Sequence, residues 1–113
     1  MKKLAVLTGS VLLLLGSQAF AEPHADAAIT HAKEAVEHGK AGHSVVLVEH
    51  AETALEHANK AVEAAKDTDA KHHMHEAVTS LKEGIEHGKL EHADKATHSV
   101  EDAIKHIEAG NKK

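Results

Sequence analysis

Histidine is the residue type that offers most chemistry in this 113-residue sequence. There are 13 histidines, and several recur at intervals of seven residues, as in His43, His50 and His57. Neutral imidazole nitrogens, together with carboxylates, bind borderline divalent ions such as Cu(II), Ni(II) and Zn(II). Residues seven apart on one helix lie about 10.5 Å apart along its axis, too far for two rings to bind one ion. Shared metal sites would therefore have to form between helices.

The apolar residues follow the same seven-residue period. Residues 50–56 and 57–63 each begin with histidine, carry alanine at the second and fifth places and a branched aliphatic residue at the sixth, and end with glutamate. If the sixth place is position a of a coiled-coil heptad, then Val48, Leu55 and Val62 are a residues, alanines fill d and g, and histidines fall at c. Position c lies beside g. The pattern therefore predicts an amphipathic helix with histidines along one edge of its apolar face.

Extending this period along the chain predicts four helices. They are expected from Pro23 into the link 38–43, from that link to about Lys66, from about Ala70 to Gly88, and from the link 87–92 to Gly110. Gly39 and Gly42 should end the first helix, and Gly88 the third. The polar a residue Thr97 should be the weakest part of the core.

The two halves of the chain are similar to each other. Residues 24–60 align with residues 73–109 without a gap, at a constant shift of 49, and a His-Gly-Lys-x-x-His link occurs in both. Two tandem, duplicated helical hairpins, over about residues 23–66 and 70–109, predict an all-α protein that folds as an antiparallel four-helix bundle. A long two-stranded hairpin, or a hairpin that dimerises, is the rival architecture.

Folding each hairpin back on itself pairs histidines across two helices. The predicted pairs are His24 with His57, His31 with His50 and His38 with His43 in the first hairpin, and His73 with His106 and His87 with His92 in the second. Ser80 and Ser99 stand where the second hairpin would have its middle pair. Small residues at g should let the paired helices approach closely enough for facing rings to share an ion. Such pairs leave coordination positions open for water, so we expect several shallow, exchangeable sites per chain.

Two further groups of residues could add ligands. His72 and His75 are three residues apart and next to Glu76, and they form the only chelate that a single helix could make. Glu34 and Glu83 each lie one turn before a link histidine, and such carboxylates could complete a site or orient a ring.

The first 21 residues have the composition of a cleavable secretory signal. Two lysines precede an apolar run over residues 4–15, and the small-residue triplet Ala19-Phe20-Ala21 follows it. The apolar run is too short for a stable membrane span. The mature domain would then be residues 22–113, exported to the periplasm of a Gram-negative bacterium, with no membrane contact after cleavage.

Composition argues against several classes of function. Removal of the two leader lysines changes the formal net charge from −5 to −7, the chain has no arginine, and its one aromatic residue lies in the leader. Nucleic-acid binding therefore lacks both its basic and its aromatic residues. The absence of cysteine excludes Cys-x-x-Cys-His haem attachment, and a single mature methionine, Met74, disfavours Cu(I). A di-iron oxidase is disfavoured because no histidine has a glutamate three residues before it.

Parts of the chain resemble the SmbP-like family of small periplasmic histidine-rich metal-binding proteins. The stretches that carry the resemblance are residues 31–43, the heptads of residues 50–63 and residues 101–106. The resemblance covers nearly the whole mature chain. It implies a periplasmic four-helix bundle that binds several divalent ions, copper above all, for metal scavenging or tolerance. The ligand candidates that it implies are His24, His31, His38, His43, His50, His57, His73, His87, His92 and His106, whereas Ser80 and Ser99 depart from the histidine pattern.

The sequence therefore predicts a non-enzymatic, monomeric, exported buffer for several divalent ions, Cu(II) first and Ni(II) or Zn(II) next. Because the ligand is neutral imidazole, binding should weaken between about pH 6.5 and 5. The alternative is a metal-independent, pH-responsive helical module in which protonation drives neighbouring histidines apart.

Overall fold

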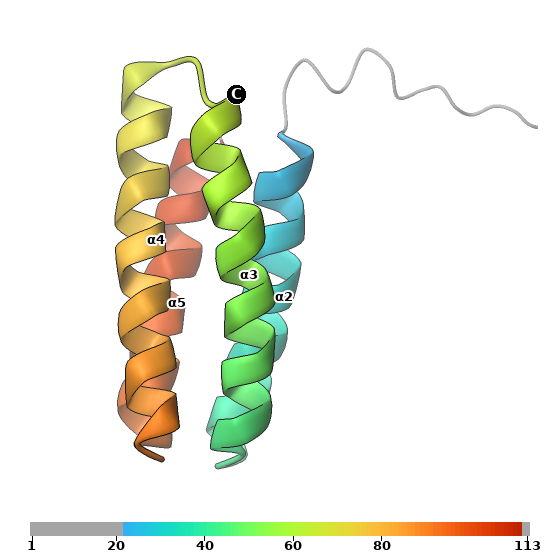
Figure 1. Ribbon diagram of the computed structural model, residues 1–113, viewed down its shortest axis with the longest axis vertical. Helices are drawn as coiled ribbons and strands as arrows, with labels where there is room; N and C mark the ends of the chain where they lie inside the picture. The colour runs from blue at the N-terminus through green and yellow to red at the C-terminus, as the bar shows by residue number, and fades with distance from the viewer. Residues whose placement is uncertain (1–21, 112–113) are drawn as a thin grey trace, which may run out of the picture.

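Four α-helices account for most of residues 22–111, the part of the chain that the computed structural model describes (Figure 1). They are α2 (Pro23–Lys40), α3 (Ser44–Ala64), α4 (Thr68–Lys89) and α5 (Ala93–Gly110). The predicted all-α class is confirmed, since this part of the chain contains four helices and no strand. None of these four helices combines the length and the apolar character needed to cross a membrane. The predicted signal peptide, residues 1–21, lies outside the described residues.

Short links connect helices that lie side by side. α2 packs along α3 and α4 packs along α5, and we call these pairs hairpin one (residues 23–64) and hairpin two (residues 68–110). The links within the two hairpins lie at the same end of the bundle (Figure 1). At the opposite end, the Asn111 side chain accepts a hydrogen bond from the Glu22 backbone N–H at 2.9 Å and donates one to Asp26 at 2.9 Å. These bonds tie the end of α5 to the start of α2.

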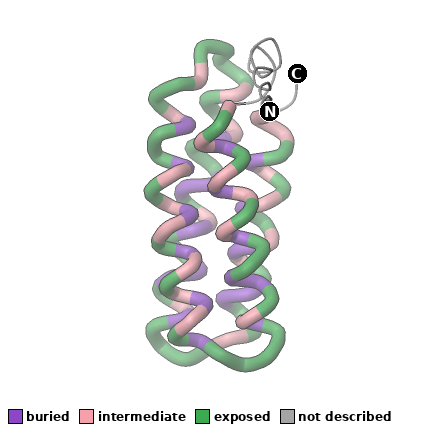
Figure 2. Tube along the Cα trace, turned by 90° about the vertical axis from the view of Figure 1, so that its right-hand side faces the viewer, coloured by how far each residue is buried: buried purple, intermediate pink, exposed green. Residues whose placement is uncertain are grey.

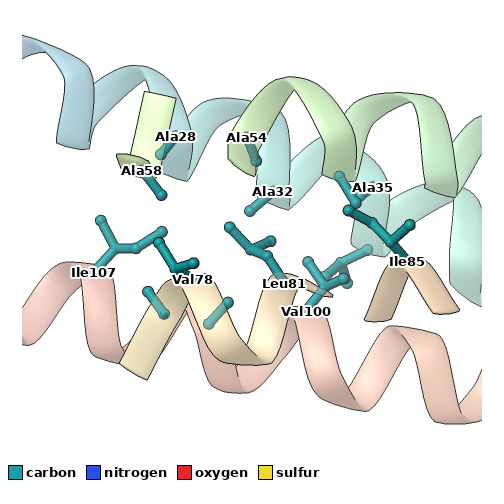
Figure 3. Close-up of a cluster of buried hydrophobic side chains, with 14 of the residues drawn as sticks. Ala28, Ala32, Ala35, Ala54, Ala58, Val78, Leu81, Ile85, Val100 and Ile107 are labelled. Atoms are coloured by element: carbon teal, nitrogen blue, oxygen red, sulfur yellow. The ribbon is translucent and has the colours of Figure 1, made fainter. Parts of the chain in front are cut away.

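The two hairpins contribute differently to the core. Hairpin one lines its inner face mostly with alanine, whereas hairpin two supplies most of the large side chains (Figure 3). The buried alanines of hairpin one are Ala25, Ala28, Ala32, Ala35, Ala51, Ala54, Ala58 and Ala61, and the large buried residues of hairpin two are Met74, Val78, Leu81, Ile85, Val100 and Ile107. The a residues Val48, Leu55 and Val62 are only partly buried at the edge of this cluster. Small side chains on both facing helices let α2 and α3 approach closely.

Burial follows the expected helical period in all four elements. Buried residues turn toward the centre of the bundle, and exposed residues cover its outer surface (Figure 2). Side chains at the borders of the buried stripes are of intermediate exposure, and most of the paired histidines fall in this class. The seven-residue period therefore places the rings at the rim of the core, as predicted.

Gly39 and Gly88 lie inside α2 and α4, so the prediction that they end these helices is wrong. Both glycines mark close contacts between helices. A Cβ atom on Gly39 would overlap the Thr97 hydroxyl, and one on Gly88 would lie 2.5 Å from Cγ2 of Val48. Each helix continues one residue beyond its glycine, because here the missing side chain serves packing rather than chain reversal.

Thr97 fills the space beside Gly39. The residue is 7% exposed, and its hydroxyl donates a hydrogen bond of 2.7 Å to the Ala93 carbonyl one turn earlier. A buried hydroxyl costs free energy only when it lacks such a partner. This polar a position is therefore a closed and hydrogen-bonded contact between α2 and α5, not the weak point that its polarity predicts.

The hairpin links place different residues in the left-handed backbone region. Gly42 has a φ of 81°, and Glu91, at the equivalent place in hairpin two, has a φ of 64°. This conformation costs about 1–2 kcal/mol in a residue with a Cβ atom, partly offset by the greater freedom of glycine in the unfolded chain. We expect Glu91→Gly to raise the free energy of unfolding by about 0.5–1 kcal/mol and Gly42→Ala to lower it by about 1 kcal/mol, as measured by urea unfolding. A less stable Glu91→Gly variant would contradict this account.

Candidate metal centre

The predicted histidine pairs of hairpin one face each other across α2 and α3. The ring centroids are 5.3 Å apart for His24 and His57, 6.1 Å for His31 and His50, and 6.0 Å for His38 and His43. In the first of these pairs the two Nδ1 atoms are 3.1 Å apart. The alanine packing beneath the rings explains this proximity, since larger side chains would hold the two helices further apart.

The rings of hairpin one also stack diagonally, which the pairing rule did not predict. His57 lies over His31 with a centroid distance of 5.8 Å and 3° between the ring planes, and His50 lies over His38 at 5.4 Å and 7°. The six rings therefore form one continuous series in the order His24, His57, His31, His50, His38 and His43, which we call the histidine column.

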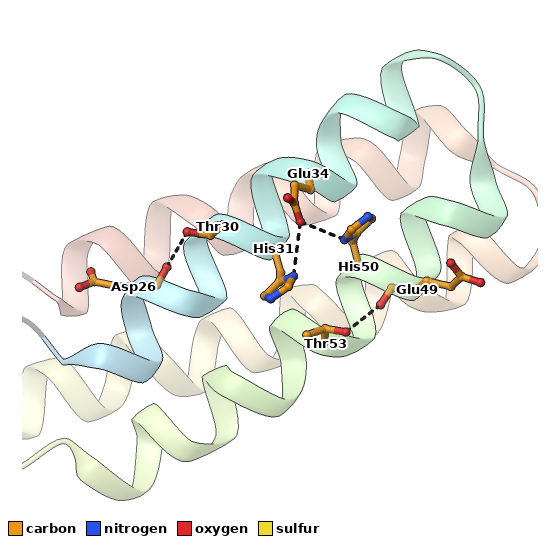
Figure 4. A network of polar contacts seen from close by, with 7 residues as sticks. All are labelled: Asp26, Thr30, His31, Glu34, Glu49, His50 and Thr53. Carbon is orange, nitrogen blue, oxygen red and sulfur yellow. Dashed lines mark hydrogen bonds and ion pairs between the residues drawn. The ribbon is translucent and has the colours of Figure 1, made fainter.

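Glu34 joins the middle pair of the histidine column (Figure 4). Its Oε1 atom lies 3.4 Å from Nδ1 of His31 and 3.1 Å from Nδ1 of His50. Within residues 22–111, these three residues are the only group of three or more histidine, cysteine or acidic residues whose ligand atoms all lie within 4.8 Å of one another. Two of the ligands come from α2 and one from α3. The centre is therefore assembled only when hairpin one is folded.

The separations within this centre match those around a bound ion. Zn(II) binds imidazole nitrogen and carboxylate oxygen at about 2.0–2.2 Å, so neighbouring ligands of a tetrahedral site are about 3.3 Å apart. The carboxylate of Glu34 lies at 3.4 Å and 3.1 Å from the two ring nitrogens. Nδ1 of His31 is buried and has no hydrogen-bond partner, although Glu34 is near. Two of the three separations are thus close to those of a tetrahedral site, all three ligand atoms lie within 4.8 Å of one another, and an ion held by them would have a fourth position for water.

The centre is open to solvent on one side. The side chains of His31, Glu34 and His50 are 34%, 50% and 30% exposed. An ion can therefore enter or leave without unfolding of the bundle, which is the behaviour of an exchangeable site rather than a closed structural one.

Hairpin two contains an interrupted version of this arrangement. The ring centroids are 5.8 Å apart for His73 and His106 and 6.3 Å for His87 and His92. Nδ1 of His73 and Nδ1 of His87 are buried without a hydrogen-bond partner. The two pairs are fourteen residues apart on each helix, or roughly 21 Å along the axis. Ser80 and Ser99 lie between them, so the pairs are separate.

Glu76 connects α4 to α5 at one end of hairpin two. Its Oε2 atom is 3.3 Å from Nε2 of His72, and its Oε1 atom is 3.9 Å from Nε2 of His106. Of the predicted single-helix chelate of His72 and His75 beside Glu76, the structure brings His72 and Glu76 together; His75 is exposed, and the same carboxylate also reaches across to α5. Outside the predicted set, His98 is exposed beside Glu101.

The structure determines which histidines Glu34 accompanies. By sequence Glu34 lies one turn before His38, but its carboxylate contacts His31, three residues before it, and His50 on the other helix. The usable signal was the His31-x-x-Glu34 spacing, because residues three apart lie on the same helical face. Only the fold could add His50 as the third member.

The equivalent place in hairpin two has the carboxylate without the rings. Glu83 corresponds to Glu34 by the shift of 49, and Ser80 and Ser99 replace the two histidines. Glu83 therefore provides a matched internal control for any role of Glu34.

Comparison with known protein families agrees with this chemistry. The model of a family described as small metal-binding protein matches residues 1–110 of the chain. Among curated protein sequences, none matches this chain. The family match covers nearly all of the sequence, and the described residues bring imidazole and carboxylate ligands together from two helices. The chain belongs to the small metal-binding protein family.

Proposed function

We propose that this protein buffers divalent metal ions in the periplasm, with Cu(II) as its principal ion and Ni(II) or Zn(II) as alternatives. Family membership supports metal binding, and the predicted leader, residues 1–21, supports export. Nitrogen-rich ligands favour borderline ions over Mg²⁺ and Ca²⁺, which prefer oxygen. Met74 is 2% exposed in the core, so its thioether offers little to Cu(I). The proposed role is storage and scavenging without catalysis.

The convergence of His31, Glu34 and His50 is the observation that carries this proposal. The Glu34 carboxylate already lies from each ring nitrogen at a distance close to that between two ligands of one ion, and all three ligand atoms lie within 4.8 Å of one another. A bound ion would also link α2 to α3, so it would stabilise the folded hairpin by an amount that grows with the logarithm of the ratio of ion concentration to Kd. Facing pairs elsewhere in both hairpins would bind further ions more weakly, because each provides two rings and no shared carboxylate.

Calorimetric titration of the metal-free protein with Cu(II) at pH 7 tests the proposal. We expect at least two ions to bind with micromolar or tighter affinity. Glu34→Gln should weaken the tightest site on the order of tenfold to a hundredfold, since it removes the anionic ligand. Glu83→Gln, its matched control, should leave that site unchanged. Fewer than two ions bound, or equal losses in the two variants, would count against this assignment.

We further propose that the bundle is a monomer built from two duplicated antiparallel hairpins. Nζ of Lys40 lies 3.8 Å from Glu101, and Nζ of Lys89 lies 3.8 Å from Glu52. The shift of 49 residues converts one ion pair into the other, which supports an origin of both hairpins from one unit. Exposed pairs of this kind each contribute at most about 1 kcal/mol, so they align the hairpins more than they stabilise them.

A metal-independent response to pH is the second candidate, and the histidine column favours it. Six rings lie 5.3–6.1 Å from their neighbours, and Glu34 is the one carboxylate within ion-pairing distance of them among the described residues. Protonation would place like charges side by side and push α2 from α3. This candidate predicts unfolding in acid that a chelator leaves unchanged, as followed by circular dichroism. A chelator-dependent transition would favour metal buffering instead.

A further inference from the structure

The histidine column has no interruption between its two ends. Each inner ring has one neighbour across the hairpin and another along the diagonal, at centroid distances of 5.3–6.1 Å. An ion bound by two of these rings therefore always has a third ring close by. Glu34 lies at the middle of the series, where its carboxylate contacts His31 and His50.

We propose that bound divalent ions move along the histidine column of hairpin one, between the pair His24 and His57 at its open end and the pair His38 and His43 at the link, without release to solvent. In each step a neutral imidazole of the next pair forms a bond to the ion while a neutral imidazole of the previous pair leaves. The ion keeps its charge and no electron is transferred. This inference rests on the proposed metal binding, and it adds a path between sites to that function.

Geometry and exposure both support such a path. The rings at the middle of the column are about one-third exposed, so the side chains have room to rotate between neighbours while the helix backbones stay fixed. His43, at the link end of the column, is exposed and is the first residue before α3, where its side chain makes no capping hydrogen bond. An ion that reaches this end is therefore accessible to an acceptor.

Hairpin two supplies the contrast within the same molecule. Its histidine pairs at the two ends are separated by Ser80 and Ser99, and no ring bridges the roughly 21 Å between them. Ions in hairpin two would have to dissociate in order to move from one end to the other. One hairpin would thus exchange ions along its length, and the other would hold them at separate positions.

Exchange spectroscopy of the protein with ring-labelled histidine and less than one equivalent of Zn(II) tests the path. We expect bound zinc to exchange between His24 and His43 faster than Zn(II) leaves the protein for a free chelator, a release rate that is measured separately. His31→Ser combined with His50→Ser copies the natural serines of hairpin two. This variant should slow the exchange about tenfold, down to the rate of zinc release, since transfer within a molecule depends on a high local concentration of the next ligand.

A second variant, which adds histidines to hairpin two, tests the path even if the serine variant fails to fold. Ser80→His combined with Ser99→His should create exchange between His73 and His87 that is faster than zinc release, which the unmodified hairpin two should lack. The path is overturned if His24–His43 exchange is unchanged by the serine variant, or if His73–His87 exchange in the histidine variant is no faster than zinc release. If zinc shifts no ring signal in hairpin one, both the proposed metal binding and the proposed path are contradicted. If zinc binds at both ends of the column but does not exchange between them, only the path is contradicted.

Discussion

Acidification from pH 7 to pH 5 is expected to release the bound ions from the centre of His31, Glu34 and His50, with the steepest loss of affinity among the sites of the protein. A metal ion binds only the neutral ring, and histidine side chains in general take up a proton near pH 6.5. Each of the two imidazoles must be neutral to bind, and the two losses multiply because one ion needs both rings. Binding is therefore present at and above neutral pH and is lost as the pH falls.

Titrations with Zn(II) or Cu(II) at several pH values between 7 and 5 measure this effect. The limiting slope should correspond to about two protons taken up per ion released. Glu34→Gln should start from a lower affinity but keep the same slope, since the two imidazoles remain. An affinity that stays constant over this pH range would refute imidazole ligation.

Truncation of Leu81 is expected to cause the largest loss of stability among core substitutions. Leu81 comes from α4, is fully buried and lies among the alanines of hairpin one (Figure 3). Leu81→Ala should lower the free energy of unfolding by about 3 kcal/mol, because the small alanines around it cannot fill the cavity. The metal affinity of the folded state should change little, since the ligands lie on α2 and α3. Urea unfolding and calorimetric titration of the same variant measure the two quantities.

The opposite substitution tests whether alanine packing sets the spacing of the rings. Ala54 is fully buried on α3 within the alanine-rich face of hairpin one. Ala54→Leu should cost only about 1–3 kcal/mol by overpacking. Its additional carbons should push α2 from α3, however, and weaken metal binding far more than Leu81→Ala does. Equal losses of affinity in both variants would show that the ring spacing does not depend on the alanine face.

The pairing of histidines could be predicted because it depends on helix geometry and link length alone. Once the chain reverses at the link, His31 must face His50, whatever packs beneath them. The assignment of Glu34 could not be made in this way. Its carboxylate can turn toward His31 or toward His38 on its own helix, and the position of His50 on α3 determines which neighbour completes the group.

The roles of the glycines, too, can be predicted from the sequence at one position and not at others. A glycine before a polar link predicts a helix end, and this reasoning succeeds at Gly42, where φ is positive. It fails at Gly39 and Gly88, since the need for a residue without a side chain arises from Thr97 and Val48 on other helices. No local pattern in the sequence distinguishes these two kinds of glycine.

Local sequence patterns are sufficient to predict the helical class, the histidine stripes and the pairs across each hairpin, because the helical period and the short links leave few alternatives. The continuity of the histidine column and the membership of Glu34 in the central group follow only from the packing of the helices. Both depend on the stagger and separation of α2 and α3. These quantities are set by alanines that pack against the large side chains of hairpin two, and hence by contacts between residues far apart in the chain.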